Sequence, residues 1–184
     1  MVLSDLVLVY GVPAVGKSIV APSLADRLGL SRLGKDDVKE ALWDGLEQPS
    51  SMTPLEWSRH LGGLAYELIW HLASALGPQL IVEAPLSQSS GGRILELHPP
   101  PVEVFLWARP EVIYERSRLR QSHQHPCHLP HGLPSLDEVN ASLRLQRPLR
   151  LGGPLLEVDL SDGHDLQGMA EWLQAQLSTS ATSR

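Results

Sequence analysis

The sequence predicts an α/β fold in which a five-stranded parallel sheet lies between two layers of helices. Five short apolar runs alternate with segments that have the apolar spacing of helices, and this alternation is typical of parallel sheets. A glycine-rich segment follows the first apolar run directly. Hydrophobic residues make up 42% of the 184 residues, so the chain can bury one substantial core.

The apolar runs place the expected strands, because short apolar runs bounded by turn residues are typical of buried strands. The strands are expected at 3–10, 31–34, 80–83, 102–107 and 155–159. The helices are expected at about 17–28, 36–42, 53–76, 110–121, 135–147 and 165–177. Together they predict one domain over 1–177, with a lid segment near 116–134 and a flexible tail at 178–184.

The helix expected at 53–76 has the clearest start signal. Thr53 is a suitable N-cap, Pro54 suits the first helical position, and Glu56 completes a capping box. Gly77-Pro78 is expected to end this helix. Its inward face is expected to carry Leu61, Leu64, Ala65, Leu68, Ile69, Leu72 and Leu76.

The glycine-rich segment fits the pattern G-x-x-x-x-G-K-S of a phosphate-binding P-loop. It reads Gly11-Val12-Pro13-Ala14-Val15-Gly16-Lys17-Ser18, with a strand before it and a helix after it. In such a loop the backbone binds phosphates, the lysine contacts the β- and γ-phosphates, and the serine hydroxyl contacts Mg²⁺. The sequence therefore predicts a P-loop NTPase three-layer sandwich that uses ATP and Mg²⁺, with Ser18 as metal ligand; GTP in place of ATP is left open.

Composition limits the possible partners. The net charge of −6 argues against general binding to nucleic acids or to membrane surfaces. Cys127 is the only cysteine, which rules out an internal disulfide and suits a reducing cytoplasm. Asp5 interrupts the first apolar run and no basic segment precedes it, so no signal peptide is expected. We expect a cytoplasmic protein with a small-molecule partner, in an oligomeric state that the sequence leaves open.

Carboxylates follow two of the expected strands. Ligands of parallel α/β sheets bind at the carboxyl ends of the strands, where Asp36, Asp37 and Glu83 are expected. There a carboxylate can accept a proton from a substrate hydroxyl or bind Mg²⁺ through water. The alternatives are that Asp36 or Asp37 only caps the next helix, and that Glu83 is a solvated strand end.

Arginines follow the strand at 102–107. Arg109 comes directly after it, and Arg116, Arg118 and Arg120 belong to the next helix. Arg116 and Arg120 share one helix face at a spacing of four and can stabilise charge on a transferring phosphoryl group. Alternatively they are surface charges paired with nearby glutamates, and Arg118 is the least informative of the three.

The expected lid holds His123, His125, Cys127, His128 and His131. These residues suggest a metal site, but their spacing fits no standard zinc pattern. A loop over the nucleotide or the substrate is the preferred interpretation.

At this point the chain resembles the small P-loop kinase group, which includes AAA-domain-like proteins, zeta-toxin-like kinases, chloramphenicol phosphotransferase and gluconate-kinase-like enzymes. The residues that carry the resemblance are 11–18, 33–42, 81–83, 114–120 and the His125-Pro126-x-His128 turn. The resemblance implies that Asp36 orients the acceptor hydroxyl or acts as its base, and that Arg116 and Arg120 contact phosphates. The chain departs from the group at Ile19, where threonine is common, at Glu83 in place of aspartate, and at Cys127 in place of glycine.

The sequence thus predicts a kinase that transfers the γ-phosphate of ATP to an alcohol group of a small molecule. Lys17, Asp36, Arg116 and Arg120 are the expected catalytic residues, and Asp36 and Glu83 are expected to contact the substrate. Sugar, nucleoside and antibiotic acceptors all stay open. The alternatives are a nucleotide-binding switch without an acceptor, a nucleotide kinase, and a toxin-type kinase acting on a nucleotide sugar. A nucleotide kinase needs basic residues in the acceptor pocket, for which the stretch 36–83 offers only Lys39 and Arg59.

Overall fold

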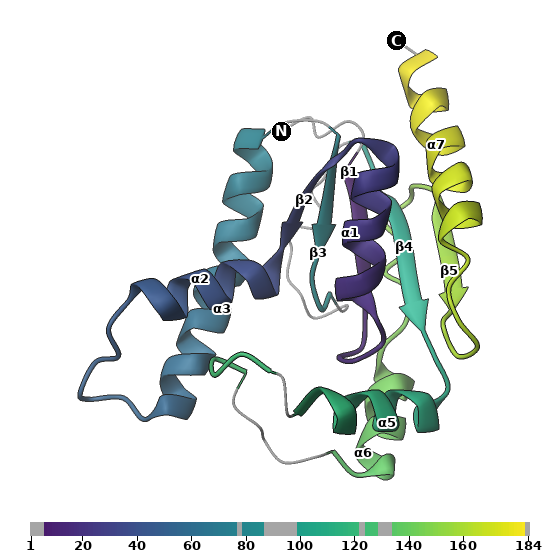
Figure 1. Ribbon diagram of the computed structural model, residues 1–184. Coiled ribbons are helices and arrows are strands. Elements are labelled where there is room, and N and C mark those ends of the chain that lie inside the picture. The colour runs from purple at the N-terminus through teal and green to yellow at the C-terminus, as the bar shows by residue number, and fades with distance from the viewer. Residues whose placement is uncertain (1–5, 77–78, 87–98, 122–123, 129–133, 183–184) are drawn as a thin grey trace.

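A computed structural model of the protein describes residues 6–76, 79–86, 99–121, 124–128 and 134–182 (Figure 1). Its five strands form one sheet in the order β2-β3-β1-β4-β5, and every neighbouring pair is parallel. The strands are β1 Leu6–Gly11, β2 Ser31–Gly34, β3 Leu80–Glu83, β4 Val102–Trp107 and β5 Leu155–Asp159. The helices are α1 Lys17–Leu28, α2 Lys35–Gly45, α3 Pro54–Leu76, α5 Pro110–Arg120, α6 Leu136–Leu145 and α7 Leu166–Thr182. The predicted fold class is confirmed.

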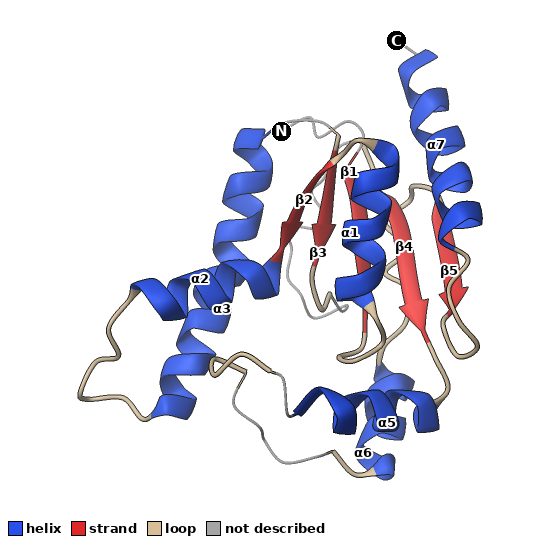
Figure 2. Ribbon diagram, viewed as in Figure 1, coloured by secondary structure: helices blue, strands red, loops and turns tan. Residues whose placement is uncertain are grey.

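Two hydrophobic cores lie on opposite faces of the sheet, because successive side chains of a strand point to opposite sides. On β1, Val7 and Val9 pack in a core with residues of α1 and α7. Leu8 and Tyr10 of the same strand pack instead in a second core, with residues of α3. Helices thus cover both faces, α1 and α7 on one and α3 on the other, which gives the three layers, and Figure 2 shows α5 and α6 beyond the carboxyl ends of the strands. No helix within the described ranges combines the length and apolarity needed to cross a lipid bilayer.

Strand β1 lies at the centre of the sheet, between β3 and β4, and all six of its residues are buried. Because the strands are parallel, the segments that follow β1, β2 and β3 leave the sheet at the same edge. Gly34 at the end of β2 is in register with Glu83 at the end of β3. This register places the loop at 11–18, the start of α2 and Glu83 near one another.

Helix α3 begins and ends as expected, but its buried face is narrower than the sequence predicts. Leu64, Leu72 and Leu76 were expected to face inward and are exposed. The buried line runs along one row at a spacing of four, with Trp70 beside it: Trp57, Leu61, Ala65, Ile69 and Ala73. The helix packs against α2 and the sheet along this row and through Ser58 and Trp70, so Leu64, Leu72 and Leu76 stay at the surface.

Other differences concern the ends of elements. Helix α7 continues to Thr182, past the predicted end at Leu177, so the predicted tail begins as helix. Helix α2 begins at Lys35 and extends to Gly45. The Gly77-Pro78 helix end lies outside the described residues.

A buried carboxylate links the centre of the sheet to the segment before β5. Glu103 of β4 is fully buried and accepts hydrogen bonds from the Tyr10 hydroxyl (2.5 Å) and from the backbone N–H of Leu151 (2.6 Å) and Arg150 (3.1 Å). The Tyr10 oxygen in turn accepts from the N–H of Leu149 (2.9 Å). Burial and the hydrogen bond to Glu103 hold the pKa of Tyr10 well above its usual value. All the polar groups of this network therefore have partners.

Candidate active site

The P-loop connects the centre of the sheet to α1. Gly11 has φ +156° and lies so close to β4 that an added Cβ would be 2.2 Å from the carbonyl oxygen of Leu106. Gly16 has φ +122° and precedes the first residue of α1. Both positions require glycine, as the motif predicts. Val15 between them is fully buried, which anchors the loop in the core below the helix start.

Lys17 is the first residue of α1 and is almost completely buried. Its Nζ donates hydrogen bonds to the carbonyl oxygens of Gly11 (3.0 Å) and Val12 (2.9 Å). Burial lowers the pKa of Lys17 to about 8, although the negative charges of Glu83 and Asp36 raise it. The ammonium is therefore held inside the loop in water-poor surroundings, where a phosphate would stabilise its charge.

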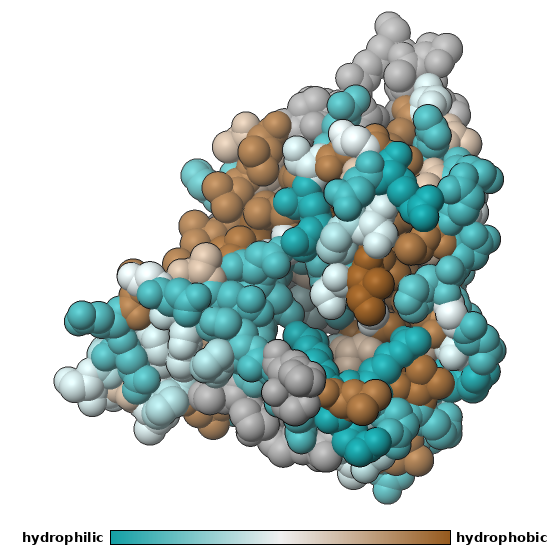
Figure 3. Space-filling view, viewed as in Figure 1, coloured by the Kyte–Doolittle hydropathy of each residue, from teal (hydrophilic) through white to brown (hydrophobic). Residues whose placement is uncertain are grey.

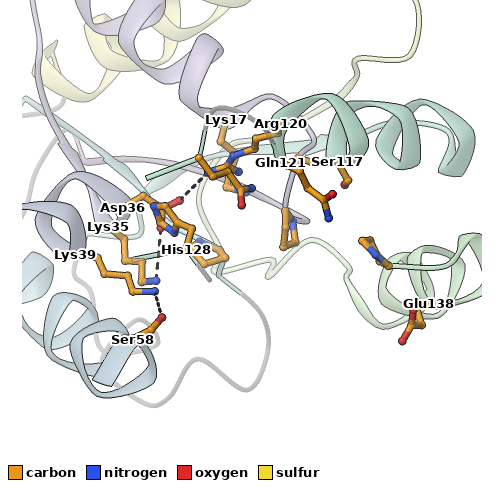
Figure 4. Close-up of a pocket in the computed structure, with 15 residues that line it drawn as sticks. Lys17, Lys35, Asp36, Lys39, Ser58, Ser117, Arg120, Gln121, His128 and Glu138 are labelled. Carbon is orange, nitrogen blue, oxygen red and sulfur yellow. Dashed lines mark hydrogen bonds and ion pairs between the residues drawn. The ribbon is translucent and has the colours of Figure 1, made fainter. Parts of the chain in front are cut away.

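A pocket of about 500 Å³ opens in front of the P-loop. Pro13, Ala14 and Lys17 line it from the loop, and residues of α2, α3, α5, α6 and the segment 124–128 line the rest, together with Pro85, Gln121 and Pro134. Figure 3 shows the molecule hollowed between α2 and α5, with mostly hydrophilic residues around the hollow. Figure 4 shows the polar side chains that reach into the pocket.

Asp36 lies in the first turn of α2 and lines this pocket. Its carboxylate is 3.6 Å from Lys35 Nζ and 3.8 Å from Arg120 Nη2. Burial alone would raise the pKa of Asp36, but its interactions with Lys35, His128, Lys17 and Arg120 lower the pKa below its usual value. Asp36 is thus ionised at neutral pH. The alternative of a capping side chain is not observed, since Gly34 is the N-cap and has no side-chain cap.

Asp37 and Glu83 share one arginine outside the pocket lining. Arg32 of β2 contacts Asp37 (Nη2–Oδ2, 2.7 Å) and Glu83 (Nη1–Oε2, 3.0 Å). Glu83 is buried rather than a solvated strand end, and burial raises its pKa against the attraction of Lys17 and Arg32. The structure thus brings Asp36, and neither Asp37 nor Glu83, to the pocket surface.

The two arginines expected at the phosphates have different partners. Arg120 lines the pocket and faces Asp36. Arg116 Nη1 donates to the carbonyl oxygen of Val15 (2.7 Å), and Nη2 donates to that of Leu160 (2.7 Å), the residue after β5. Arg116 therefore holds the P-loop against the end of β5 and is not among the pocket-lining residues. The helical spacing predicted a shared face but could not reveal these carbonyls.

The remaining sequence candidates lie outside the pocket. Arg109 pairs with Asp162 (2.7 Å) at the surface, and Arg118 pairs with Glu115 (3.0 Å). Ser18 is exposed in the first turn of α1, next to Lys17.

Among the pocket-lining residues that were not predicted as site residues are Lys35, Lys39 and Ser58. Lys35 and Lys39 are one helical turn apart on α2. Lys39 Nζ donates to Ser58 Oγ of α3 (2.9 Å) and to the carbonyl oxygen of Cys127 (2.9 Å). The sequence did hold one signal for the two lysines: they are four residues apart, on the same face of the predicted helix, and Asp36 lies between them in the sequence.

The described part of the histidine-rich segment packs on α2. His125 Nε2 lies 3.2 Å from Asp44, and His128 Nε2 lies 2.8 Å from Glu40. Cys127 is buried, and burial raises the pKa of its thiol to about 11. Glu40, Cys127 and His128 approach one another closely enough to hold a metal ion, and Glu40 and His128 lie at hydrogen-bond distance from each other. His123 and His131, the other two histidines of the predicted lid, lie outside the described residues.

Comparisons with known proteins agree with this geometry. A family model described as an AAA domain matches residues 6–132. The structure of a candidate kinase from Chloroflexus aurantiacus is 32% identical, with a TM-score of 0.79 and coverage of 94% of this chain and 97% of that one. A gluconokinase from Sinorhizobium meliloti (18% identity, TM-score 0.60, coverage 100% and 97%) has the same fold.

A shikimate kinase from Acinetobacter baumannii, solved with shikimate, also has this fold (17% identity, TM-score 0.61, coverage 96% and 94%). No curated protein gives a significant match. The resemblance to P-loop kinases that the sequence indicated is confirmed.

Proposed function

The chain belongs to the AAA-domain family of P-loop proteins, and we propose that it is a kinase that transfers the γ-phosphate of ATP to a hydroxyl group of a small molecule. One observation carries the proposal: the P-loop lysine, an ionised aspartate and an arginine from a third element meet in one pocket. Lys17, Asp36 and Arg120 all line it, and Arg120 faces Asp36 at 3.8 Å. The kinase likeness of the Chloroflexus aurantiacus relative supports this reading.

The phosphates of ATP would bind the P-loop and the N-terminus of α1. There backbone N–H groups and the helix dipole favour negative charge. Lys17 would contact the β- and γ-phosphates, and binding them would restore the charge that burial disfavours. Arg116 fixes the carbonyl of Val15 and so positions the loop, while Arg120 would stabilise charge on the transferring group.

Mg²⁺ fits the donors near the loop. The exposed hydroxyl of Ser18 and the carboxylate of Asp36 are oxygen donors, the type that Mg²⁺ prefers. Ser18 would be its protein ligand, and the ion would supply charge neutralisation between the phosphates. Glu83 is buried, and its carboxylate would stabilise the positive charge of Lys17 and pair with Arg32.

Asp36 would bind the acceptor hydroxyl. An ionised carboxylate accepts the hydroxyl hydrogen bond, which orients the nucleophilic oxygen toward the γ-phosphate and can take its proton during transfer. The position of Asp36 between Arg120 and Lys35 keeps it ionised, as this role requires.

The test is ADP release from MgATP with a panel of hydroxylated compounds: sugars, hydroxy acids, sugar phosphates, nucleosides, aminoglycosides and chloramphenicol-like compounds. Asp36→Ala should keep ATP binding within a few-fold and lower acceptor-stimulated turnover by about 10²- to 10⁴-fold. Lys17→Ala should lose both binding and turnover.

Asp37→Asn is the matched control, because this neighbouring carboxylate pairs with Arg32 outside the pocket. Near-normal turnover of Asp36→Ala would refute the role of Asp36. Slow ATP hydrolysis that no panel member stimulates would favour a nucleotide-binding switch.

A further inference from the structure

The chain contains three lysines, Lys17, Lys35 and Lys39, and all three line the pocket. The other positively charged side chains of the chain are arginines. Lys17 belongs to the P-loop, and Arg120 faces the same end of the pocket. Lys35 and Lys39 thus add two positive charges on the side of Asp36 that faces away from the P-loop (Figure 4). The nucleotide phosphates would bind on the opposite side, at Lys17.

Lys35 and Lys39 approach the same spot on α3. An added Cβ at Gly62 would lie 3.8 Å from Lys35 Nζ and 3.9 Å from Lys39 Cε. Both side chains therefore extend from α2 to one place on the facing helix, beside Ser58. Two ammonium groups that extend to the same place repel each other, and only Lys35 has a carboxylate close by, that of Asp36 at 3.6 Å.

Lys39 has neutral hydrogen-bond partners. The Ser58 hydroxyl and the Cys127 carbonyl accept from its ammonium, and no carboxylate in the described ranges lies within ion-pair distance of it. Burial and the charge of Lys35 lower the pKa of Lys39, against the weaker opposing effect of the more distant carboxylates of Asp36 and Glu40. A buried cation that is next to a second cation and lacks a carboxylate partner is costly. A bound anion would remove that cost.

We propose that the acceptor carries an anionic group, a carboxylate or a phosphate ester, which Lys35, Lys39 and Ser58 bind while Asp36 receives its hydroxyl. This inference rests on the proposed kinase function and narrows its substrate class. The order of the side chains across the pocket, with Asp36 between the P-loop end and the two lysines, sets the orientation of the acceptor. Its hydroxyl faces the γ-phosphate and its anionic group points away from it.

The proposal makes some acceptors poor. Aminoglycosides are cationic and would add repulsion beside Lys35 and Lys39. Neutral sugars and chloramphenicol-like compounds would leave the ammonium of Lys39 without a counterion in a desolvated site. Hydroxy acids and sugar phosphates satisfy the site, and nucleoside monophosphates do so through their phosphate.

The first experiment measures binding without turnover. Protein labelled with ¹³C at the ε carbon of lysine gives three side-chain NMR signals, which Lys35→Met and Lys39→Met assign. A non-hydrolysable ATP analogue with Mg²⁺ occupies the P-loop. Each acid is then titrated against its primary amide, and each sugar phosphate against its parent sugar; these two arms separate a carboxylate ligand from a phosphate ligand.

We expect the anionic member of at least one pair to shift the Lys35 and Lys39 signals saturably and to raise the pKa of Lys39, while its neutral partner does neither. Inorganic phosphate without nucleotide provides the positive control, because it should shift Lys17. If carboxylate and phosphate probes leave Lys35 and Lys39 unchanged while Lys17 responds to phosphate, the inference is overturned.

The second experiment measures turnover. Lys35→Met and Lys39→Met should each raise KM for the acceptor about ten- to hundredfold and leave KM for ATP within a few-fold. Arg59→Met is the control, since it removes an exposed cation from α3. Lys39→Met should unfold at a temperature no lower than the wild type, because it removes a buried charge.

The two proposals fail in different ways. If the protein phosphorylates neutral acceptors and this turnover is unchanged in both lysine variants, the proposed anion site is wrong and the proposed kinase function is retained. Anion binding at Lys35 and Lys39 without phosphotransfer to any panel member overturns the kinase and leaves the anion site standing.

Discussion

Replacing Lys17 with methionine should remove a cost to stability that depends on pH. Burial lowers the pKa of Lys17 from 10.5 to about 8 in the folded protein. Between these values the unfolded chain binds more protons than the folded one, so stability rises with pH in this window. The cost is fully present below about pH 8, where both states carry the charge.

The size of the effect follows from the two pKa values. The difference between 10.5 and about 8 corresponds to an upper limit of about 3 kcal/mol at pH 7. About 2 kcal/mol of this cost should disappear between about pH 7 and about pH 9.5. Methionine also leaves the carbonyls of Gly11 and Val12 without their lysine donor, which opposes the gain by a similar amount at every pH.

The assay is urea unfolding of nucleotide-free wild type and Lys17→Met at both pH values. The stability of the variant relative to wild type should fall by about 2 kcal/mol as the pH rises. Groups that titrate in both proteins, such as Cys127, cancel in this comparison. If the stability difference between wild type and Lys17→Met is the same at both pH values, burial does not destabilise the charged form of Lys17 and the argument is refuted.

Two further predictions concern glycine and cysteine. Gly11→Ala should lower the free energy of unfolding by about 3 kcal/mol, because the added Cβ would overlap the Leu106 carbonyl. The control Gly63→Ala, at an exposed position of α3, should raise it by up to about 1 kcal/mol. Urea unfolding measures both, and equal effects would contradict the close approach at Gly11. Cys127 should react with a thiol reagent at about pH 8 far more slowly in the native protein than in urea, because burial raises its pKa to about 11; equal rates would show that the thiol is accessible.

Much of the fold was predictable because its signals are local. The apolar runs at 80–83 and 102–107 became strands with those bounds, and the P-loop lies between a strand and a helix as its motif requires. Which row of α3 is buried was not predictable. The leucine row and the row of Leu61, Ala65 and Ile69 are both apolar, and only packing against α2 and the sheet decides between them.

The candidate site was predictable where one segment supplies it. The P-loop and Asp36 follow directly from strand ends. Lys39 was named only as one of two basic residues in the stretch 36–83, and its contacts could not be predicted, because one of its partners is a backbone carbonyl 88 residues away, at Cys127. Arg116 likewise binds carbonyls from two distant segments, which carry no side-chain signal in the sequence. Backbone acceptors contributed by tertiary packing are invisible to a motif.

The carboxylate of Glu103 bears on how the protein unfolds. It accepts hydrogen bonds from Tyr10 of the central strand and from the backbone that leads into β5. Detaching that backbone while the sheet stays intact would leave the buried carboxyl group of Glu103 with too few hydrogen-bond donors. Local unfolding of the C-terminal part of the chain alone should therefore cost nearly as much free energy as global unfolding. We expect strand β5 to exchange its amide hydrogens together with β1, in one cooperative event.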